Sequence, residues 1–281
     1  MVLGTQQLAQ YRNLGFVQIE DMFSEDEITE IGYHASIDLG EPTERRVFEK
    51  CGELVRAVHG SHLARPFFSE LVRLPRLLDM AEQIVRDRVY IHQFKINAKA
   101  AHGGDTWAWH QDSFFWRTED GMPDMQAVNF VIHLDEATDA NGPLLLMPGS
   151  HHGGDLAAKA AAGAAWESTV SAKLKHEIDR TDLAAACRRY GIVAAKGGAG
   201  GVLIFHPSVI HGSTANMSPF DRRLLILSYN SASNQLLPVP DPRPEFLAAR
   251  ENTTPLTALD DDVLPVRSPN DRLQTVSPAS W

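Results

Sequence analysis

Two stretches, VYIHQFKINAKA at residues 89–100 and RRLLILSYN at residues 222–230, read as β-strands and decide the fold. Five more strand-like stretches lie before and between them: LVRAVHG (54–60), TWAWHQDSFFW (106–116), AVNFVIHL (127–134), PLLLMPGS (143–150) and GGVLIFH (200–206). Several alternate apolar with polar residues, and turn signals such as Asn141-Gly142-Pro143 separate them. Many short strands without interleaved long helices favour an all-β sandwich, barrel or jelly roll over a βαβ fold.

Helices are expected before these strands. The first forty residues read as a short helix, a strand-like GFVQI at residues 15–19 and a second helix. Ser24 and Glu27 match the capping box that opens a helix, and Ile28 and Ile31 follow at helical spacing. The fold class is therefore mainly β with flanking N-terminal helices.

Residues 155–190 interrupt the strands and are expected to form a helical insertion. They contain the Ala-rich AAKAAAGAAW (157–166) and then TDLAAACRRYG, which predicts a helix that Thr181 or Asp182 opens and Gly191 ends. Such an insertion could be a lid that covers a substrate and excludes water, or a peripheral decoration. The chain after the last strand is rich in Pro, Asp and Arg and is expected to be irregular.

The composition limits partners and location. Among 281 residues, 26 are Lys or Arg and 36 are Asp or Glu, a formal charge of −10 that disfavours nucleic acid and anionic membranes as partners. Neither a signal peptide nor an apolar run of membrane-spanning length is evident, so we expect a cytoplasmic monomer or homodimer. Neither internal repeats nor low-complexity linkers are found, so we expect residues 1–281 to form a single domain.

Histidine and cysteine are unequally used. With 12 histidines and only 2 cysteines, the chain offers neither a disulfide framework nor a cysteine-rich zinc module. A metal site here would have to use nitrogen and oxygen donors.

The sharpest local motif is His110-Gln111-Asp112, inside the expected strand at 106–116. Side chains at i and i+2 of a strand project from the same face, so His110 and Asp112 can converge on one ion. Iron(II) commonly takes two imidazoles and one carboxylate, which leaves its opposite face open. A strand histidine bonded to a nearby acid is the commoner explanation of such a tripeptide, so a metal site needs a second histidine from a distant strand.

The stretch GGVLIFHPSVIHGSTANMSPFDRR (200–223) supplies two candidates, His206 and His211. Ser213 lies two residues after His211 on the same strand face, and Arg222 lies eleven residues after His211. The guanidinium of Arg222 could pair with the far carboxylate of a dicarboxylate while Ser213 donates to it. This spacing favours His211 as the third ligand, with His206 as its main competitor.

The order of His110-x-Asp112, His211-x-Ser213 and Arg222 resembles the non-haem iron(II)/2-oxoglutarate dioxygenases of the phytanoyl-CoA dioxygenase superfamily. Within this superfamily, the sequence more closely resembles the ectoine hydroxylases and the related free-leucine hydroxylases. The closer resemblance lies in five stretches: IHQFKINAKA (91–100), WAWHQDSFFWRTEDGMP (107–123), AVNF (127–130), NGPLLLMPGSHHGG (141–154) and HGSTANMSPFDRR (211–223). The resemblance runs from about residue 11 to about residue 255. It implies a double-stranded β-helix, the cupin-like jelly roll, with iron between its sheets.

The resemblance implies that His110, Asp112 and His211 are the iron(II) ligands. Halogenases of this fold have a small residue at the carboxylate position, so Asp112 implies hydroxylation. Desaturation or cyclisation by the same oxidant stays open.

The resemblance also implies a co-substrate pocket. Arg222 would clamp the 5-carboxylate of 2-oxoglutarate with help from Ser213, and Gln93 and Asn97 would line the same pocket. Trp116 matches the aromatic residue after the ligand motif and is placed in the pocket, against cofactor and substrate.

Arg56 is a weaker candidate. Its region contacts substrate in relatives, and an arginine there could bind a substrate carboxylate. An ordinary surface ion pair is an equal alternative.

The implied activity is hydroxylation of an aliphatic C–H in a small amino-acid-like substrate, with Fe(II), 2-oxoglutarate and O₂ yielding succinate and CO₂. One alternative keeps this chemistry but acts on a terpenoid, polyketide or peptidyl intermediate in natural-product biosynthesis. A second is a non-catalytic jelly-roll binding protein.

Overall fold

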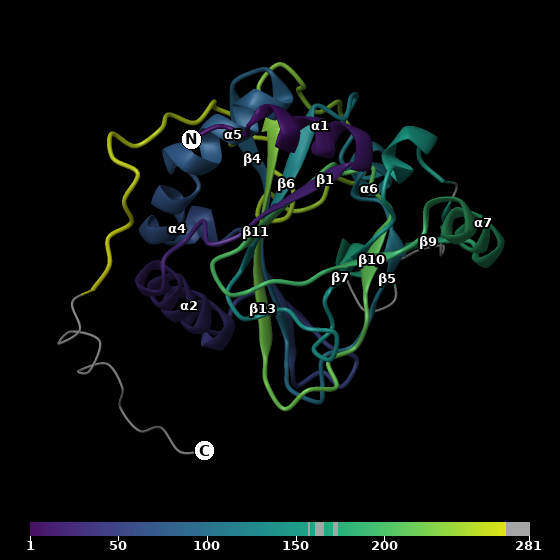
Figure 1. Cartoon of the computed structure of the whole chain (residues 1–281), viewed down its shortest axis with the longest axis horizontal. Helices are drawn as coiled ribbons and strands as arrows, with labels where there is room; N and C mark the ends of the chain where they lie inside the picture. Colours follow the sequence, from purple (N-terminus) through teal and green to yellow (C-terminus); the bar gives the residue numbers. More distant parts are fainter. Residues whose placement is uncertain (157, 161–165, 171–173, 268–281) are drawn as a thin grey trace.

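The computed structural model describes residues 1–156, 158–160, 166–170 and 174–267, and its core is a pair of facing antiparallel sheets (Figure 1). The larger sheet has the strand order β1-β11-β6-β13-β4-β3-β2, and the smaller has the order β10-β7-β12-β5. Their strands are β1 (Phe16–Ile19), β2 (Arg46–Phe48), β3 (Val55–His59), β4 (Val89–Lys99), β5 (Trp107–His110), β6 (Ala127–His133), β7 (Leu144–Leu146), β10 (Val193–Ala195), β11 (Val202–Phe205), β12 (His211–Ser213) and β13 (Arg222–Ser231). This architecture confirms the expected double-stranded β-helix.

Helices cover the outer face of the larger sheet. Figure 1 shows α2, α4 and α5 along one side of the long strands, with the smaller sheet on the other side. Their apolar side chains, such as Ile31, Phe68 and Leu77, pack in one cluster with Phe94 and Phe130 of the sheet. The helices are α1 (Thr5–Leu14), α2 (Glu25–Gly40), α3 (Ser61–Ala64), α4 (Pro66–Leu71), α5 (Pro75–Val85), α6 (Asp112–Thr118) and α7 (Arg180–Tyr190). The inner face is thereby left free to line a site.

The expected N-terminal helices are confirmed. Ser24 caps α2, its side chain accepting a hydrogen bond from the Glu27 amide at 3.3 Å while the Glu27 carboxylate accepts one from the Ser24 amide at 2.9 Å. Helices α3, α4 and α5 were not expected from the strand-like pattern after residue 54. Pro66 and Pro75 begin two of them at the first helical position, where the missing N–H costs nothing.

The 155–190 segment is only partly helical. Helix α7 is confirmed, but Asp179 caps it rather than Thr181 or Asp182, because the Asp179 carboxylate accepts a hydrogen bond from the Thr181 amide at 2.9 Å. The described part of the Ala-rich stretch is a strand, β8 (Ala158–Ala160), which pairs with β9 (His176–Ile178). Residues 157, 161–165 and 171–173 lie outside the described residues.

The tail after β13 is irregular, as expected, up to residue 267 where its description ends. It passes the start of β4 and the helical layer, where the Leu256 amide donates to the Val89 carbonyl and the Leu259 amide donates to the Arg73 carbonyl. Across the described part of the chain, no helix combines the length and the apolar character that crossing a membrane requires.

Candidate metal centre and co-substrate pocket

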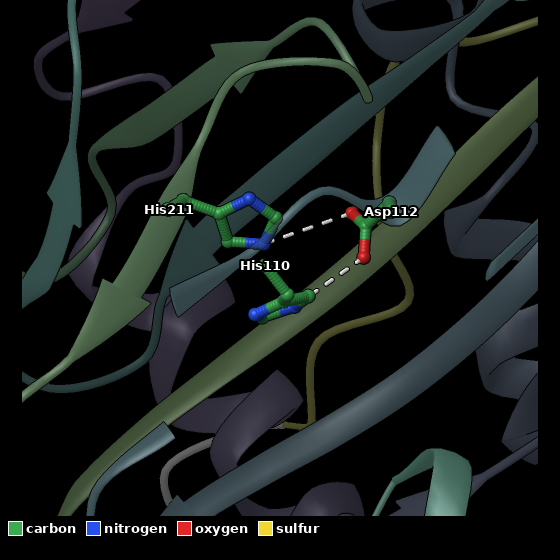
Figure 2. Close-up of side chains that lie close together, drawn as sticks. All are labelled: His110, Asp112 and His211. Atoms are coloured by element: carbon green, nitrogen blue, oxygen red, sulfur yellow. Dashed lines mark ion pairs between the residues drawn. The ribbon is translucent and has the colours of Figure 1, made fainter. Parts of the chain in front are cut away.

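Three side chains with metal-ligating atoms meet between the two sheets. His110 ends β5, Asp112 begins α6, and His211 begins β12 directly opposite His110 in the β5–β12 ladder. Figure 2 shows the two imidazoles turned toward the carboxylate, with His110 Nε2 3.7 Å from Asp112 Oδ1 and His211 Nε2 3.8 Å from Asp112 Oδ2. The ligand atoms lie within 4.8 Å of one another, and within the described ranges no other such cluster of His, Cys, Asp or Glu occurs.

Both imidazoles are oriented by the backbone. His110 Nδ1 lies 2.7 Å from the Ala108 carbonyl, and His211 Nδ1 lies 2.9 Å from the Val209 carbonyl. A carbonyl can only accept, so each Nδ1 carries the proton and each Nε2 keeps a lone pair directed at the centre. Burial, with His110 nearby, lowers the pKa of His211 to about 3, so this ring is neutral and available as a ligand.

Asp112 reaches the centre from a helix, not from a strand as expected. The strand ends at His110, and extended Gln111 (φ −125°, ψ 127°) turns the chain into α6. Alternation through this one extended residue still puts the carboxylate on the side of His110. Burial alone would raise the pKa of Asp112, but the positive charges of the imidazoles, when protonated, and of Lys95 outweigh it and hold the pKa well below its usual range.

Asn129 on β6 fixes the Asp112 carboxylate. Its amide donates to Asp112 Oδ2 at 2.8 Å, and its own carbonyl accepts from the Ser228 hydroxyl at 2.6 Å. All three side chains are buried. This chain of bonds leaves Asp112 one orientation relative to the imidazoles.

Replacing Asn129 by Ala should weaken iron(II) binding about 10- to 100-fold, the usual cost of removing a residue that orients a ligand. The dissociation constant for iron(II), measured by anaerobic titration, checks this expectation. Ser228→Ala is the matched control one bond further away and should cost less. Equal iron affinity in Asn129→Ala and the wild type would contradict the role of Asn129.

A small cavity is lined by His110 and His211 of this centre. Asn97, Ser213 and Arg222 line one end of it, with Trp107 opposite Ser213 in the β5–β12 ladder, and Lys95 lines the other end. Several polar atoms at the first end are buried without a hydrogen-bond partner among the described residues: Asn97 Oδ1, Ser213 Oγ, and Nε and Nη1 of Arg222. Buried polar groups are rarely left unpaired. Of these atoms, the Ser213 hydroxyl and the two guanidinium nitrogens of Arg222 can donate. These donors match an anionic ligand with a far carboxylate, placed between Arg222 and the histidines.

Arg222 carries its charge without a carboxylate partner among the described residues. It is 1% exposed, its Nη2 donates to the Gly142 carbonyl at 2.7 Å, and burial lowers its pKa to about 9. Lys99 lies opposite it in the β4–β13 ladder and donates to the carbonyls of Asp105 and Thr214. Burial and the charge of Arg222 lower the pKa of Lys99 to about 6. The charge at this end of the cavity is therefore positive, and a bound anion would neutralise it.

The comparisons with known proteins agree with this arrangement. The family model for phytanoyl-CoA dioxygenase (PhyH) matches residues 11–224. The chain belongs to the phytanoyl-CoA dioxygenase family.

Relatives of this dioxygenase include a proline hydroxylase and ectoine dioxygenases. It is 41% identical to the L-proline trans-4-hydroxylase of Streptomyces griseoviridis over 78% of this chain and 82% of that protein. It is 34% identical to the ectoine dioxygenase of Sphingopyxis alaskensis over 88% of this chain and 83% of that protein. The structure of EctD from S. alaskensis with 2-oxoglutarate and 5-hydroxyectoine superposes with a TM-score of 0.81 at 32% identity, covering 93% of this chain and 89% of that one.

This dioxygenase uses Fe(II), 2-oxoglutarate and O₂. Another EctD structure contains bound iron, and the two-histidine, one-carboxylate donor set found here suits Fe(II). The unpaired donors around Arg222 suit the dicarboxylate.

The structure brings some expected pocket residues to the cavity and not others. Asn97, Ser213 and Arg222 line it. Gln93 is buried on the same face of β4 as Asn97, four residues away and opposite Ser228. Trp116 does not line it, because its indole is 1% exposed and packs with Phe115, Met122, Ala127 and Leu174 in a separate cluster.

Arg56 forms an ion pair, but in the interior and not at the surface. It is buried, its Nη1 lies 2.8 Å from Glu49 Oε2, and its Nη2 donates to the Thr106 carbonyl at 2.7 Å. Its guanidinium carbon lies 3.7 Å from the centre of the Trp107 ring. These contacts support the wall of the cavity formed by Trp107.

His206 lies away from the centre. Its Nδ1 accepts a hydrogen bond from the Ser208 amide at 3.1 Å, and its ring lies 5.4 Å from that of His151.

Three further residues of the site, Asn129, Lys95 and Lys99, were not predicted from the sequence. A lysine inside an apolar strand such as VYIHQFKINAKA was a usable signal for the latter two, because lysine is rarely buried.

Proposed function

We propose that this dioxygenase hydroxylates an unactivated aliphatic C–H of a free amino acid, with L-proline as the first candidate. The single observation that carries the proposal is the two-histidine, one-carboxylate centre beside a cavity with cations at both ends. Arg222 and Ser213 suit the far carboxylate of 2-oxoglutarate, which leaves Lys95 at the opposite end. The 41% identity to an L-proline hydroxylase supports an amino acid as the second anion.

His110, Asp112 and His211 would hold the iron. Bound iron, with 2-oxoglutarate and O₂, supplies the oxidising power, and succinate and CO₂ leave as co-products. The protein's own part is positioning: Asn129 orients Asp112, and the backbone carbonyls behind both imidazoles keep Nε2 unprotonated. Arg222 binds the co-substrate in one direction, so that its keto acid end faces the histidines.

Lys95 is suited to bind the substrate carboxylate. It lines the cavity with His110 and His211, burial lowers its pKa, and its ammonium lies 5.9 Å from the Trp107 ring. The acidic side chain whose charge acts on Lys95 is Asp112. An amino acid bound there would have its aliphatic carbons between Lys95 and the metal centre.

Turnover with defined substrates tests the proposal. Purified enzyme with Fe(II), ascorbate and 2-oxoglutarate is incubated with L-proline, L-leucine, ectoine or a lipophilic acid, and succinate and hydroxylated product are measured by mass spectrometry. We expect one succinate per hydroxylated amino acid, and more of both with L-proline. Succinate formation at the substrate-free rate with every amino acid would refute the proposal.

Ectoine is the second candidate substrate. The supporting observation is that ectoine dioxygenases match at 31–34% identity over 85–92% of this chain. Structural likeness to tailoring enzymes such as the carbocyclase SnoK is at 21% identity and shows the shared fold alone. A non-catalytic binding protein would have no need of unpaired donors at a co-substrate end.

Binding of 2-oxoglutarate should take up protons. At pH 7.5 most Lys99 is neutral, because its pKa is about 6, and a dicarboxylate beside Arg222 raises that pKa and favours the charged form. We expect the calorimetric enthalpy of 2-oxoglutarate binding to differ between Tris and phosphate buffers, corresponding to an uptake of a substantial fraction of one proton. Lys99→Met should remove this difference, and an identical enthalpy in both buffers for the wild type would contradict it.

We also propose that residues 155–190 cover the substrate as a lid. The described end of this segment is attached to the residues beside the iron ligands: Gln111 donates to the Gly154 carbonyl at 3.1 Å and accepts from the Leu156 amide at 2.8 Å. Substrate with 2-oxoglutarate should therefore slow limited proteolysis in this segment severalfold. Equal cleavage rates with and without these ligands would contradict a lid.

We propose a cytoplasmic, single-domain enzyme that is a monomer or a homodimer and has a small-molecule substrate. The charge of −10 supports the absence of nucleic-acid and membrane partners. Light scattering of the purified protein measures the oligomeric state directly.

A further inference from the structure

His59 is a buried histidine whose ring makes no hydrogen bond to any described residue. It is the last residue of β3, is 1% exposed, and neither Nδ1 nor Nε2 has a partner in the part of the chain that the structure describes. Burial and nearby cations lower its pKa to about 3, so the imidazole is neutral. A neutral imidazole carries one donor and one acceptor nitrogen, and both are left unused here.

The sheet register places His59 on the face that lines the cavity. His59 is directly opposite Lys95, and Ala57 is directly opposite Asn97. Directly opposed residues of two strands project from the same face. Since Lys95 and Asn97 both line the cavity, His59 lies on the cavity face beside Lys95.

This position lies outside the end suited to 2-oxoglutarate. In the β4–β13 ladder Arg222 pairs with Lys99, whereas Lys95 pairs with Ile226, four residues further along. His59 is at the level of Lys95 and therefore at the far end from Arg222. A ligand group that hydrogen-bonds to His59 therefore belongs to the substrate and not to 2-oxoglutarate.

The charges around His59 define that group. The charged side chains that act on it are Lys95, Arg243 and Arg45, all of them cations. Arg243 is neutralised by Asp120, with Nη2 2.5 Å from Oδ2, and Arg45 donates to the His59 carbonyl at 2.9 Å. Cationic side chains can only donate hydrogen bonds. The His59 ring therefore supplies a hydrogen-bond acceptor at a place where the surrounding charged side chains are all donors.

We propose that His59 is a specificity-determining residue, one ring nitrogen accepting a hydrogen bond from the amino group of a substrate whose carboxylate binds Lys95. The inference rests on the proposed function. It identifies the residue by which the substrate site distinguishes an amino acid from a small carboxylate that has no amino group. A free α-amino acid carries the carboxylate and the N–H donor on the same carbon, which matches the neighbouring Lys95 and His59. A carboxylate that lacks the N–H leaves the imidazole unpaired.

The test compares two probes that differ in one atom group: L-proline, and (S)-tetrahydrofuran-2-carboxylate, in which oxygen replaces the ring N–H. Dissociation constants are measured by anaerobic calorimetry on full-length enzyme loaded with Fe(II) and 2-oxoglutarate. We expect the wild type to bind L-proline at least about tenfold more tightly than the oxygen analogue, because the analogue cannot donate. His59→Leu should weaken L-proline binding about 10- to 100-fold and leave the analogue within about threefold, removing the discrimination.

Thermal unfolding separates recognition from a structural role. His59→Leu replaces an unpaired buried polar ring by an apolar group, so its unfolding temperature should be equal to or above that of the wild type. His59→Gln keeps an acceptor and should retain part of the discrimination.

Two results overturn the inference while leaving the proposed function intact: wild-type L-proline affinity in His59→Leu, or an equal loss for both probes with a lowered unfolding temperature. Absence of binding and turnover with every amino acid in the wild type overturns the proposed function, and this inference with it.

Discussion

Asp112→Asn is expected to abolish succinate formation and to leave the enzyme without iron after dialysis. The substitution keeps the size of the side chain but removes the only carboxylate of the cluster and its negative charge. Substitutions of outer residues that orient a ligand cost about 10- to 100-fold in metal affinity, and loss of the ligand itself should exceed that. Iron per protein, measured by metal analysis, and succinate, measured by mass spectrometry, are the readouts.

Asp139→Asn is the matched control for this variant. It makes the same chemical change at a side chain that is 79% exposed and pairs with Lys196 at the surface. Iron content and turnover should equal those of the wild type. If Asp112→Asn turned over at the wild-type rate with full iron content, the assignment of the metal centre would be wrong.

Arg222→Gln is expected to raise the KM for 2-oxoglutarate strongly while leaving iron binding unchanged. Removing one partner of a buried, hydrogen-bonded charge pair costs about 2–5 kcal/mol, which is about 30-fold to several thousandfold in affinity. The iron ligands are on β5, α6 and β12, whereas Arg222 begins β13, so the two effects should separate. Initial rates at varied 2-oxoglutarate, together with an iron titration, measure both.

Arg223→Gln is the control in the adjacent position. Arg223 faces the other side of β13 and pairs with Asp135 at 2.8 Å, so its loss should change stability but not the KM for 2-oxoglutarate. A 2-oxo acid without the far carboxylate gives an independent check. The wild type should discriminate against it, and Arg222→Gln should discriminate far less; unchanged discrimination would contradict the clamp.

The sequence was sufficient for the elements whose signal is local. Alternation and turn residues predicted β4, β6, β11 and β13, and the Ser24–Glu27 pattern predicted the start of α2, because a strand face and a helix cap are each determined by a few neighbouring residues. The spacing of His110, Asp112 and His211 likewise pointed to the residues that meet in space.

The elements that sequence analysis missed depend on tertiary contacts. Residues 112–118 have the aromatic composition of a strand but form α6, which buries Phe115 and Trp116 against Met122 and Leu174. For the same reason Trp116 was placed in the cavity although it lies in the core. Asn129 and His59 were not recognised because an isolated polar residue in an apolar strand has no local signature, and only the pairing of strands shows what it faces.

The β5–β12 ladder has a consequence for how new specificities arise. His110 and His211 are separated by a hundred residues of chain, yet the distance between them is an interstrand spacing, maintained by backbone hydrogen bonds and independent of the length of the chain between them. The 155–190 segment leaves the fold after β7 and rejoins it at β10, two strands that pair with each other. A change in the length of this segment, through evolution or by grafting from a relative, therefore leaves the pairing of His110 with His211 unaltered.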